Sequence, residues 1–181
     1  MLITNGTDLG DTSIGLLKEL LSLLDSRLKV IENQIGLASN LESNGLFDRA
    51  EYFVGVGFVA IQQYLVDTLV FQGFEKTYRA WQYGQQLQCG HYDVALMNAA
   101  ANYWKHESEE YEKERVQLQS GKKEIKDYDA FVVIPDVTAN AEYPLVEVLT
   151  ILNNSPQLSL IKLLPRITHW VSGLPIKNDL N

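Results

Sequence analysis

A polar run in the second half of the chain, residues 102–110, contains side chains that could carry out chemistry. On a helix, Asn102 and Glu110 lie one turn before and one turn after His106, so all three can contact one ligand or hold the imidazole in one tautomer. Lys105 places a positive charge beside them. A histidine that exchanges a proton, next to cations that stabilise developing phosphate charge, could support metal-independent RNA cleavage. We therefore name His106, Asn102, Lys105 and Glu110 as candidate catalytic residues.

A structural interpretation of the same residues stays open. His106 stands where its helix changes from small residues to charged ones, and the imidazole can simply form an ordinary pair with Glu110. Isolated histidines seldom mark functional sites. Sequence alone does not choose between the two roles.

Three further residues are candidate ligand contacts. Arg49 and Arg79 each carry a guanidinium group that can bind two phosphate oxygens, and surface ion pairs are the alternative for both. Trp104 precedes Lys105 and also falls on a core-like stripe of its helix. The aromatic residues around Arg79 could stack nucleobases, but they equally suit the core and rim of a helical bundle.

No metal or cofactor is predicted. His106 and Glu110 could supply two ligands, whereas zinc or di-iron centres need more, and neither HExxH nor paired ExxH motifs occur. Cys89 lies near His91 without an orienting carboxylate, so we expect an incidental thiol. As the only cysteine, Cys89 excludes an intramolecular disulfide and fits a reducing compartment. The first residues lack the features of a signal peptide, and we expect a cytoplasmic protein.

The stretch Leu46 to Phe74 predicts the central helix. Its middle carries a single charge, Asp67, and its apolar surface runs nearly all the way round, so other elements must cover it on more than one side. The uncharged part, Tyr52 to Val66, is shorter than the ~20 apolar residues of a membrane span and includes two glutamines. We expect no membrane role. Gly55 and Gly57 would let another backbone approach closely.

Periodicity predicts the helices around this central one. Apolar residues at steps of three or four form a narrow seam from Ile14 to Ile35, whose partner is either the central helix or the same helix in a second subunit. Other predicted helices cover residues 75–86, 92–118 and 144–152, and a last helix, which Pro165 must kink or divide, follows Pro156. Phe131 to Val137 is β-branched and contains Pro135, which predicts an extended segment or a short strand.

These patterns predict one domain over residues 1–181, with loose ends at 1–10 and 175–181. The fold class is all-α: a bundle of five or six helices around a central apolar helix, with one short irregular extended segment. The formal net charge of −8 argues against broad attraction to nucleic acid or anionic membrane, although a small basic site remains possible.

The helical plan and the segment ANYWKHESEE, residues 101–110, resemble the HEPN superfamily of helical-bundle proteins. This family is common in bacterial toxin–antitoxin and phage-defence systems, and many members are dimeric ribonucleases. The resemblance implies that His106 is the family's catalytic histidine. Family nucleases carry an arginine, then four to six residues, then the histidine, and this chain has Ala99, Ala100 and Ala101 at the positions of that arginine. Asn102, four residues before His106, is the only polar neighbour on that side. The chain is then either an inactive relative or one that recruits Arg49 or Arg79 from another helix.

Two functions follow as expectations. The first is a HEPN-like conflict or defence protein that acts on RNA or a nucleotide, possibly as a metal-independent endoribonuclease. The second is a non-enzymatic, acidic, dimeric helical module that binds another protein. We expect a homodimer in either case, and a small apolar ligand between helices is a third possibility.

Overall fold

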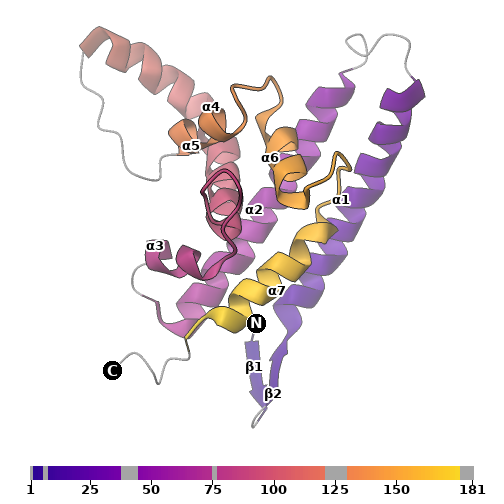
Figure 1. Cartoon of the computed structure of the whole chain (residues 1–181), viewed down its shortest axis with the longest axis vertical. Helices are drawn as coiled ribbons and strands as arrows, with labels where there is room; N and C mark the ends of the chain where they lie inside the picture. The colour runs from indigo at the N-terminus through magenta and orange to yellow at the C-terminus, as the bar shows by residue number, and fades with distance from the viewer. Residues whose placement is uncertain (1, 6–7, 38–44, 75–76, 121–129, 176–181) are drawn as a thin grey trace.

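The computed structural model describes residues 2–5, 8–37, 45–74, 77–120 and 130–175. The chain forms the predicted all-α bundle, with six helices of eight residues or more in the described part (Figure 1). A short hairpin precedes them, in which β1 (Leu2–Asn5) pairs antiparallel with β2 (Asp8–Asp11). Residues 1–10 were predicted to be a loose end, and this prediction is wrong for residues 2–5 and 8–10, which belong to the two strands. At the other terminus Leu174 is buried, and the predicted loose residues 176–181 lie outside the described part.

The helices follow in chain order. The long ones are α1 (Thr12–Leu37), α2 (Leu46–Gln72) and α4 (Asp93–Ser120). The short ones are α3 (Thr77–Ala80), which continues into the 3-10 turn η2 (Trp81–Tyr83), then α5 (Ala130–Val137), α6 (Pro144–Asn153), the 3-10 turn η3 (Ile161–Leu163) and α7 (Leu164–Gly173).

α2 is the centre of the bundle, as predicted. It packs along α1 and α4 and also contacts α6, while α5 packs on α4 (Figure 1). The most apolar window of α2 is 56% buried inside the chain. By length and composition α2 is also the one described helix that could cross a bilayer, but a buried core helix passes the same test.

The seam of α1 faces α2 of the same chain. Leu21, Leu28 and Ile31 are at most 1% exposed, and Leu17 and Leu24 are buried beside them. These residues repeat every three or four positions, so they form one stripe along the helix. Of the two partners that the sequence left open for this stripe, the structure places α2 against it.

Side chains, rather than a backbone, fill the space left by the two glycines of α2. A Cβ atom on Gly55 would overlap the indole ring of Trp104, and one on Gly57 would overlap the Leu160 side chain. The prediction of a close backbone approach at these glycines is therefore wrong. The glycines instead let α4 and the segment before α7 seat bulky side chains directly on the surface of α2.

The prediction of an extended segment at Phe131 to Val137 is also wrong, because these residues form α5. Their β-branched composition favours strands only weakly, and packing overrides it. Ala130 and Ile134 lie one turn apart and are both buried, and the Phe131 ring lies 5.1 Å from that of Tyr103 on α4. Pro135 comes late in this short helix, where it removes only one backbone hydrogen bond.

Carboxylates on α1 attach the segment that leads into α7. Asp25 accepts three hydrogen bonds and Glu32 accepts one, and most of these donors are backbone N–H groups. The bonds to Asp25 come from Ser159 Oγ (2.7 Å), Leu160 N (2.7 Å) and Ile161 N (3.2 Å), and the bond to Glu32 comes from Leu158 N (2.7 Å). These amides begin η3 and would otherwise lack acceptors, so α1 caps it from outside.

Glu51 on α2 caps α6 in the same way. The N–H groups of Leu145 and Val146 donate to its two carboxylate oxygens at 2.8 and 2.9 Å. Pro144 starts the helix, as predicted, and it has no N–H to satisfy. Negative charge at a helix N-terminus is also favourable for the helix dipole.

We predict opposite effects for two glycine-to-alanine substitutions. Gly55→Ala should lower the free energy of unfolding by about 1–2 kcal/mol, because the new methyl group overlaps the Trp104 ring. Gly15→Ala should raise it by about 0.5–1 kcal/mol, because that glycine lies in α1 with nothing within 4 Å. Urea denaturation of the two variants measures both changes. If both alanines stabilise the protein equally, Trp104 does not pack on Gly55.

Candidate functional site

The candidate residues Asn102 and Lys105 belong to a cluster of polar side chains between α2 and α4. Its centre is Gln62, which is 8% exposed. The Gln62 amide donates to Asn98 Oδ1 and Asn102 Oδ1, both at 2.8 Å. Lys105 Nζ donates to Gln62 Oε1 at 2.6 Å. Burying the Gln62 amide is tolerated because these bonds satisfy it.

The polar groups that a catalytic role would require are already hydrogen-bonded within the protein. The Asn102 side-chain oxygen accepts from Gln62, and the Lys105 ammonium donates to Gln62. Gln62 therefore orients both groups. His106 is exposed, one residue beyond Lys105 on α4. The side chain of Glu110 lies outside the described part of the chain. Of the four candidate catalytic residues, the structure thus brings Asn102 and Lys105 together, around Gln62.

Trp104 has a packing role. Its ring lies over Gly55 and makes an edge-to-face contact with Tyr52, at a centroid distance of 5.5 Å and an interplanar angle of 83°. A half-buried indole that covers a glycine fastens α4 to α2. This matches the core-like stripe in the sequence better than the predicted ligand contact.

Arg49 and Arg79 are not brought together. Arg49 is in the first turn of α2, whereas Arg79 is in α3, beyond the other end of α2. The helix between them is about 35 Å long at 1.5 Å per residue. Both residues are exposed. Within one chain, the two guanidinium groups therefore do not converge on one phosphate.

The described residues contain no group of three or more metal-binding side chains. One shifted pKa is found near the start of α2. Partial burial, followed by the negative charges of Asp48 and Glu142, raises the pKa of Tyr143 above its usual value of 10. The ring of Tyr143 stacks on Phe47 at 5.2 Å. This phenol thus lies among acidic side chains at the start of α2.

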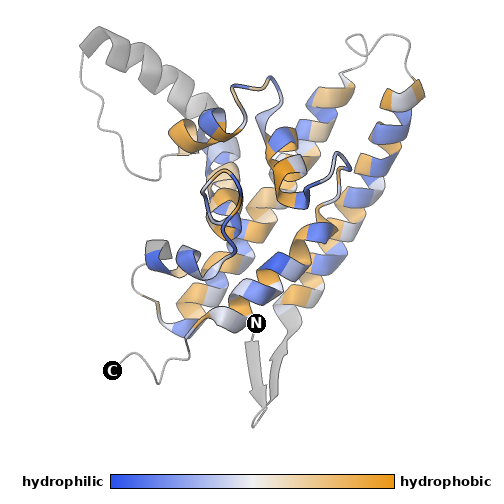
Figure 2. Cartoon of the chain, viewed as in Figure 1, coloured by the Kyte–Doolittle hydropathy of each residue, from blue (hydrophilic) through white to orange (hydrophobic). Residues whose placement is uncertain are grey.

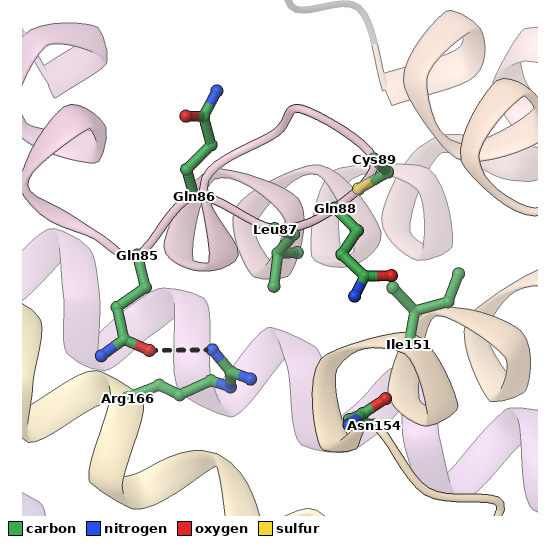
Figure 3. Close-up of a pocket in the computed structure, with 8 residues that line it drawn as sticks. All are labelled: Gln85, Gln86, Leu87, Gln88, Cys89, Ile151, Asn154 and Arg166. Atoms are coloured by element: carbon green, nitrogen blue, oxygen red, sulfur yellow. Dashed lines mark hydrogen bonds between the residues drawn. The ribbon is translucent and has the colours of Figure 1, made fainter.

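A pocket of about 410 Å³ lies between the loop that precedes α4 and the ends of α6 and α7 (Figure 3). Polar side chains dominate its lining. The lining residues are Gln85, Gln86, Leu87, Gln88, Cys89, Ile151, Asn154 and Arg166. Sequence analysis did not identify this pocket, because its parts come from three separate segments.

An ion pair between buried Asp93 and half-buried Arg166 joins the segments around the pocket. Asp93 is 1% exposed and accepts from Gln85 N (3.0 Å), Val94 N (2.8 Å) and Arg166 Nη1 (3.3 Å). Arg166 also donates to Leu152 O, at 3.0 Å. Because Asp93 offsets the charge of Arg166, the pocket is a weak attractor of anions. Through these bonds the pair connects the loop before α4, the end of α6 and the start of α7.

The largest unexplained surface feature is apolar. α1 exposes a row of aliphatic side chains: Leu16 (67%), Leu20 (39%), Leu23 (66%), Val30 (47%) and Leu37 (87%). On α2, Tyr52 (57%) and Val70 (72%) are exposed as well. We call these seven residues the apolar back face. The hydropathy colouring shows hydrophobic residues along much of α2, between the other helices of the bundle (Figure 2).

Both parts of the apolar back face turn away from the segment that precedes α7. At about 100° per residue, Leu23 is about 160° around α1 from Asp25, which binds the segment before α7. Tyr52 and Val70 are each about 140° around α2 from Gly57, which contacts Leu160 of that segment. Both rows therefore point away from the segment that covers the opposite side.

Comparisons with known proteins found no match: no family model, no curated protein and no solved structure is similar to this chain. The resemblance to the HEPN superfamily therefore stays a prediction.

We predict that two neighbouring glutamines of α2 differ sharply in their contribution to stability. Gln62→Ala should lower the free energy of unfolding by about 2–3 kcal/mol, because it leaves a cavity and removes the partner of Asn98, Asn102 and Lys105. Gln63→Ala should change it by less than about 0.5 kcal/mol, since Gln63 is exposed and bonds only to Asp67. Equal losses in urea denaturation would contradict a structural role for the cluster.

Proposed function

We propose that this chain is a non-enzymatic helical module that works as a homodimer, and that the apolar back face is its dimer interface. The observation that carries the proposal is the row of exposed aliphatic residues on α1. Leu16, Leu23, Val30 and Leu37 follow one another at intervals of seven, the repeat of helices that pack lengthwise on a partner helix.

The size of the apolar back face supports this proposal. Its seven side chains, exposed by 39% to 87%, leave on the order of 600 Å² of apolar surface open, which is the upper end for a monomer. Half-buried Val56, Val59 and Val66 of α2 adjoin it. A standard interface buries roughly 800 Å² on each partner. An acidic chain of net charge −8 gains nothing from placing this surface on an anionic membrane.

Action on RNA or a nucleotide is the second candidate function. It is favoured by the exposure of Lys105 and His106 at one end of the polar cluster. Against it stand the bonds of Asn102 and Lys105 to Gln62 and the separation of Arg49 from Arg79. Without a second cation beside it, one histidine offers little stabilisation for a developing phosphate charge.

We predict that polar substitutions in the apolar back face abolish the dimer. Replacing Leu16 and Leu23 by glutamine should weaken dimerisation at least a hundredfold, since each buried leucine contributes about 1.5–3 kcal/mol. Size-exclusion chromatography with light scattering measures the mass. Val132→Gln, which alters an exposed aliphatic residue on α5, is the matched control and should remain dimeric. A wild-type chain that is monomeric at high micromolar concentration would end the proposal.

We also predict that the purified protein does not cleave RNA through His106. Wild type and His106→Ala should leave single-stranded RNA equally intact over hours, in the absence of added metal. His91→Ala serves as a control for general effects of removing a histidine. Cleavage by the wild type that is lost only in His106→Ala would replace the first proposal with the second.

A further inference from the structure

The apolar back face is suited to one occupant, the same face of a second copy. Resting on the proposed function, we infer that two copies meet with their α1 helices antiparallel, around a two-fold axis that passes beside Leu23. In such a dimer the same surface serves on both partners, so each contact occurs twice. Residues equally far before and after Leu23 then face each other.

This arrangement pairs apolar residues with apolar residues. Leu23 meets Leu23 of the second copy on the axis. Leu16 lies seven residues before the axis and Val30 seven after it, so each meets the other in the second copy. All three are exposed in the single chain, at 67%, 66% and 47% for Leu16, Leu23 and Val30. The contacts repeat at the spacing of knobs-into-holes packing.

Arg27 selects this direction and register. It follows Leu23 by four residues and precedes Val30 by three, so its positive charge falls within the row. A parallel pairing would set Arg27 against Arg27 of the second copy. An antiparallel pairing of Leu23 with Val30 would move the axis between Ser26 and Arg27, and would again bring the two arginines together. Like charges placed opposite each other are unfavourable.

With the axis beside Leu23, Arg27 meets an opposite charge. Four residues before the axis stands Glu19, and four residues after it stands Arg27. Each dimer therefore contains two pairs of Glu19 from one copy with Arg27 from the other. Both residues are exposed on α1 in the single chain. Among the registers that align the row, this one gives both apolar contact and charge complementarity.

Residues on α2 extend the contact. Tyr52, beside Trp104 of α4, and Val70 are exposed toward opposite ends of α2, and both point away from the segment before α7. Two α1–α2 pairs that pack face to face cover both ends of the row. The dimer interface would then be a four-helix arrangement, in which α1 packs on α1 and α2 packs on α2 of the second copy.

Disulfide trapping tests the arrangement directly. All variants carry Cys89→Ser, because Cys89 is exposed and would form disulfides of its own. Leu23→Cys should form a disulfide-linked dimer by itself under mild oxidation, since a residue on a two-fold axis faces its own copy. Leu16→Cys and Val30→Cys should each fail alone and should link when the two variants are mixed under reducing conditions and then oxidised.

Charge reversal gives an independent measurement. Arg27→Glu should raise the dissociation constant of the dimer about tenfold, because two opposite-charge pairs become two like-charge pairs. The double variant Glu19→Arg with Arg27→Glu should restore most of the affinity. Reversal of Lys29, an exposed residue of α1 outside the row, is the control and should leave the dissociation constant within about twofold.

The outcomes separate this inference from the function on which it rests. A monomeric wild type ends both. In a second outcome, the Leu16 and Leu23 substitutions disrupt the dimer, but Leu16→Cys forms a disulfide with its own copy. The α1 helices are then parallel, and only the proposed arrangement is overturned. In a third outcome, the same substitutions disrupt the dimer, but Val30→Cys forms a disulfide with its own copy and Leu23→Cys does not. The two-fold axis then lies elsewhere, and again only the proposed arrangement is overturned.

Discussion

The whole structure depends on covering α2, whose apolar surface extends nearly all the way round. α1, α4, α6 and the segment before α7 each cover one part of it. Two glycines make this close cover possible, because Trp104 and Leu160 sit directly on Gly55 and Gly57. The part around Tyr52 and Val70 is only partly covered by the described residues of the same chain: Val70 is 72% exposed, and Tyr52, although its ring contacts Trp104, is 57% exposed. The dimer proposed above would complete what one chain leaves open.

Polar contacts decide which segment covers which part of α2. Hydrophobic burial is not directional, so it cannot by itself select one arrangement of short helices. Asp25 and Glu51 do select, because each binds backbone N–H groups at the start of a particular turn or helix. The bond of Arg166 to Asp93 adds a third such contact. Each contact would be lost if its segment shifted by a turn.

Local patterns predicted much of this fold. The apolar seam from Ile14 to Ile35, the uncharged run of α2 and Pro144 at the start of α6 depend only on neighbours in the chain, and the structure confirms them. The last helix was predicted to follow Pro156, but α7 begins at Leu164, next to the Pro165 that was predicted to divide that helix. α5 was missed because burial of Ile134 outweighs a β-branched composition.

The candidate site was harder to predict. Gln62, which organises Asn102 and Lys105, lies about 40 positions before them, and Asp93 lies 73 positions before Arg166. Such distant pairs follow no regular spacing in the sequence, so a sequence pattern cannot reveal them.

α1 carries two seams of apolar residues, and only the burial of each seam in the structure shows which one packs within the chain. The inner seam, with Leu21 and Leu28, is fully buried, whereas Leu16 and Leu23 are two-thirds exposed. A single bundle requires only the inner seam of an edge helix, so the outer seam is the feature that a partner explains. The pocket beside Arg166 opens near α6 and α7, on the side opposite the outer seam, so it would stay accessible in both copies of the dimer.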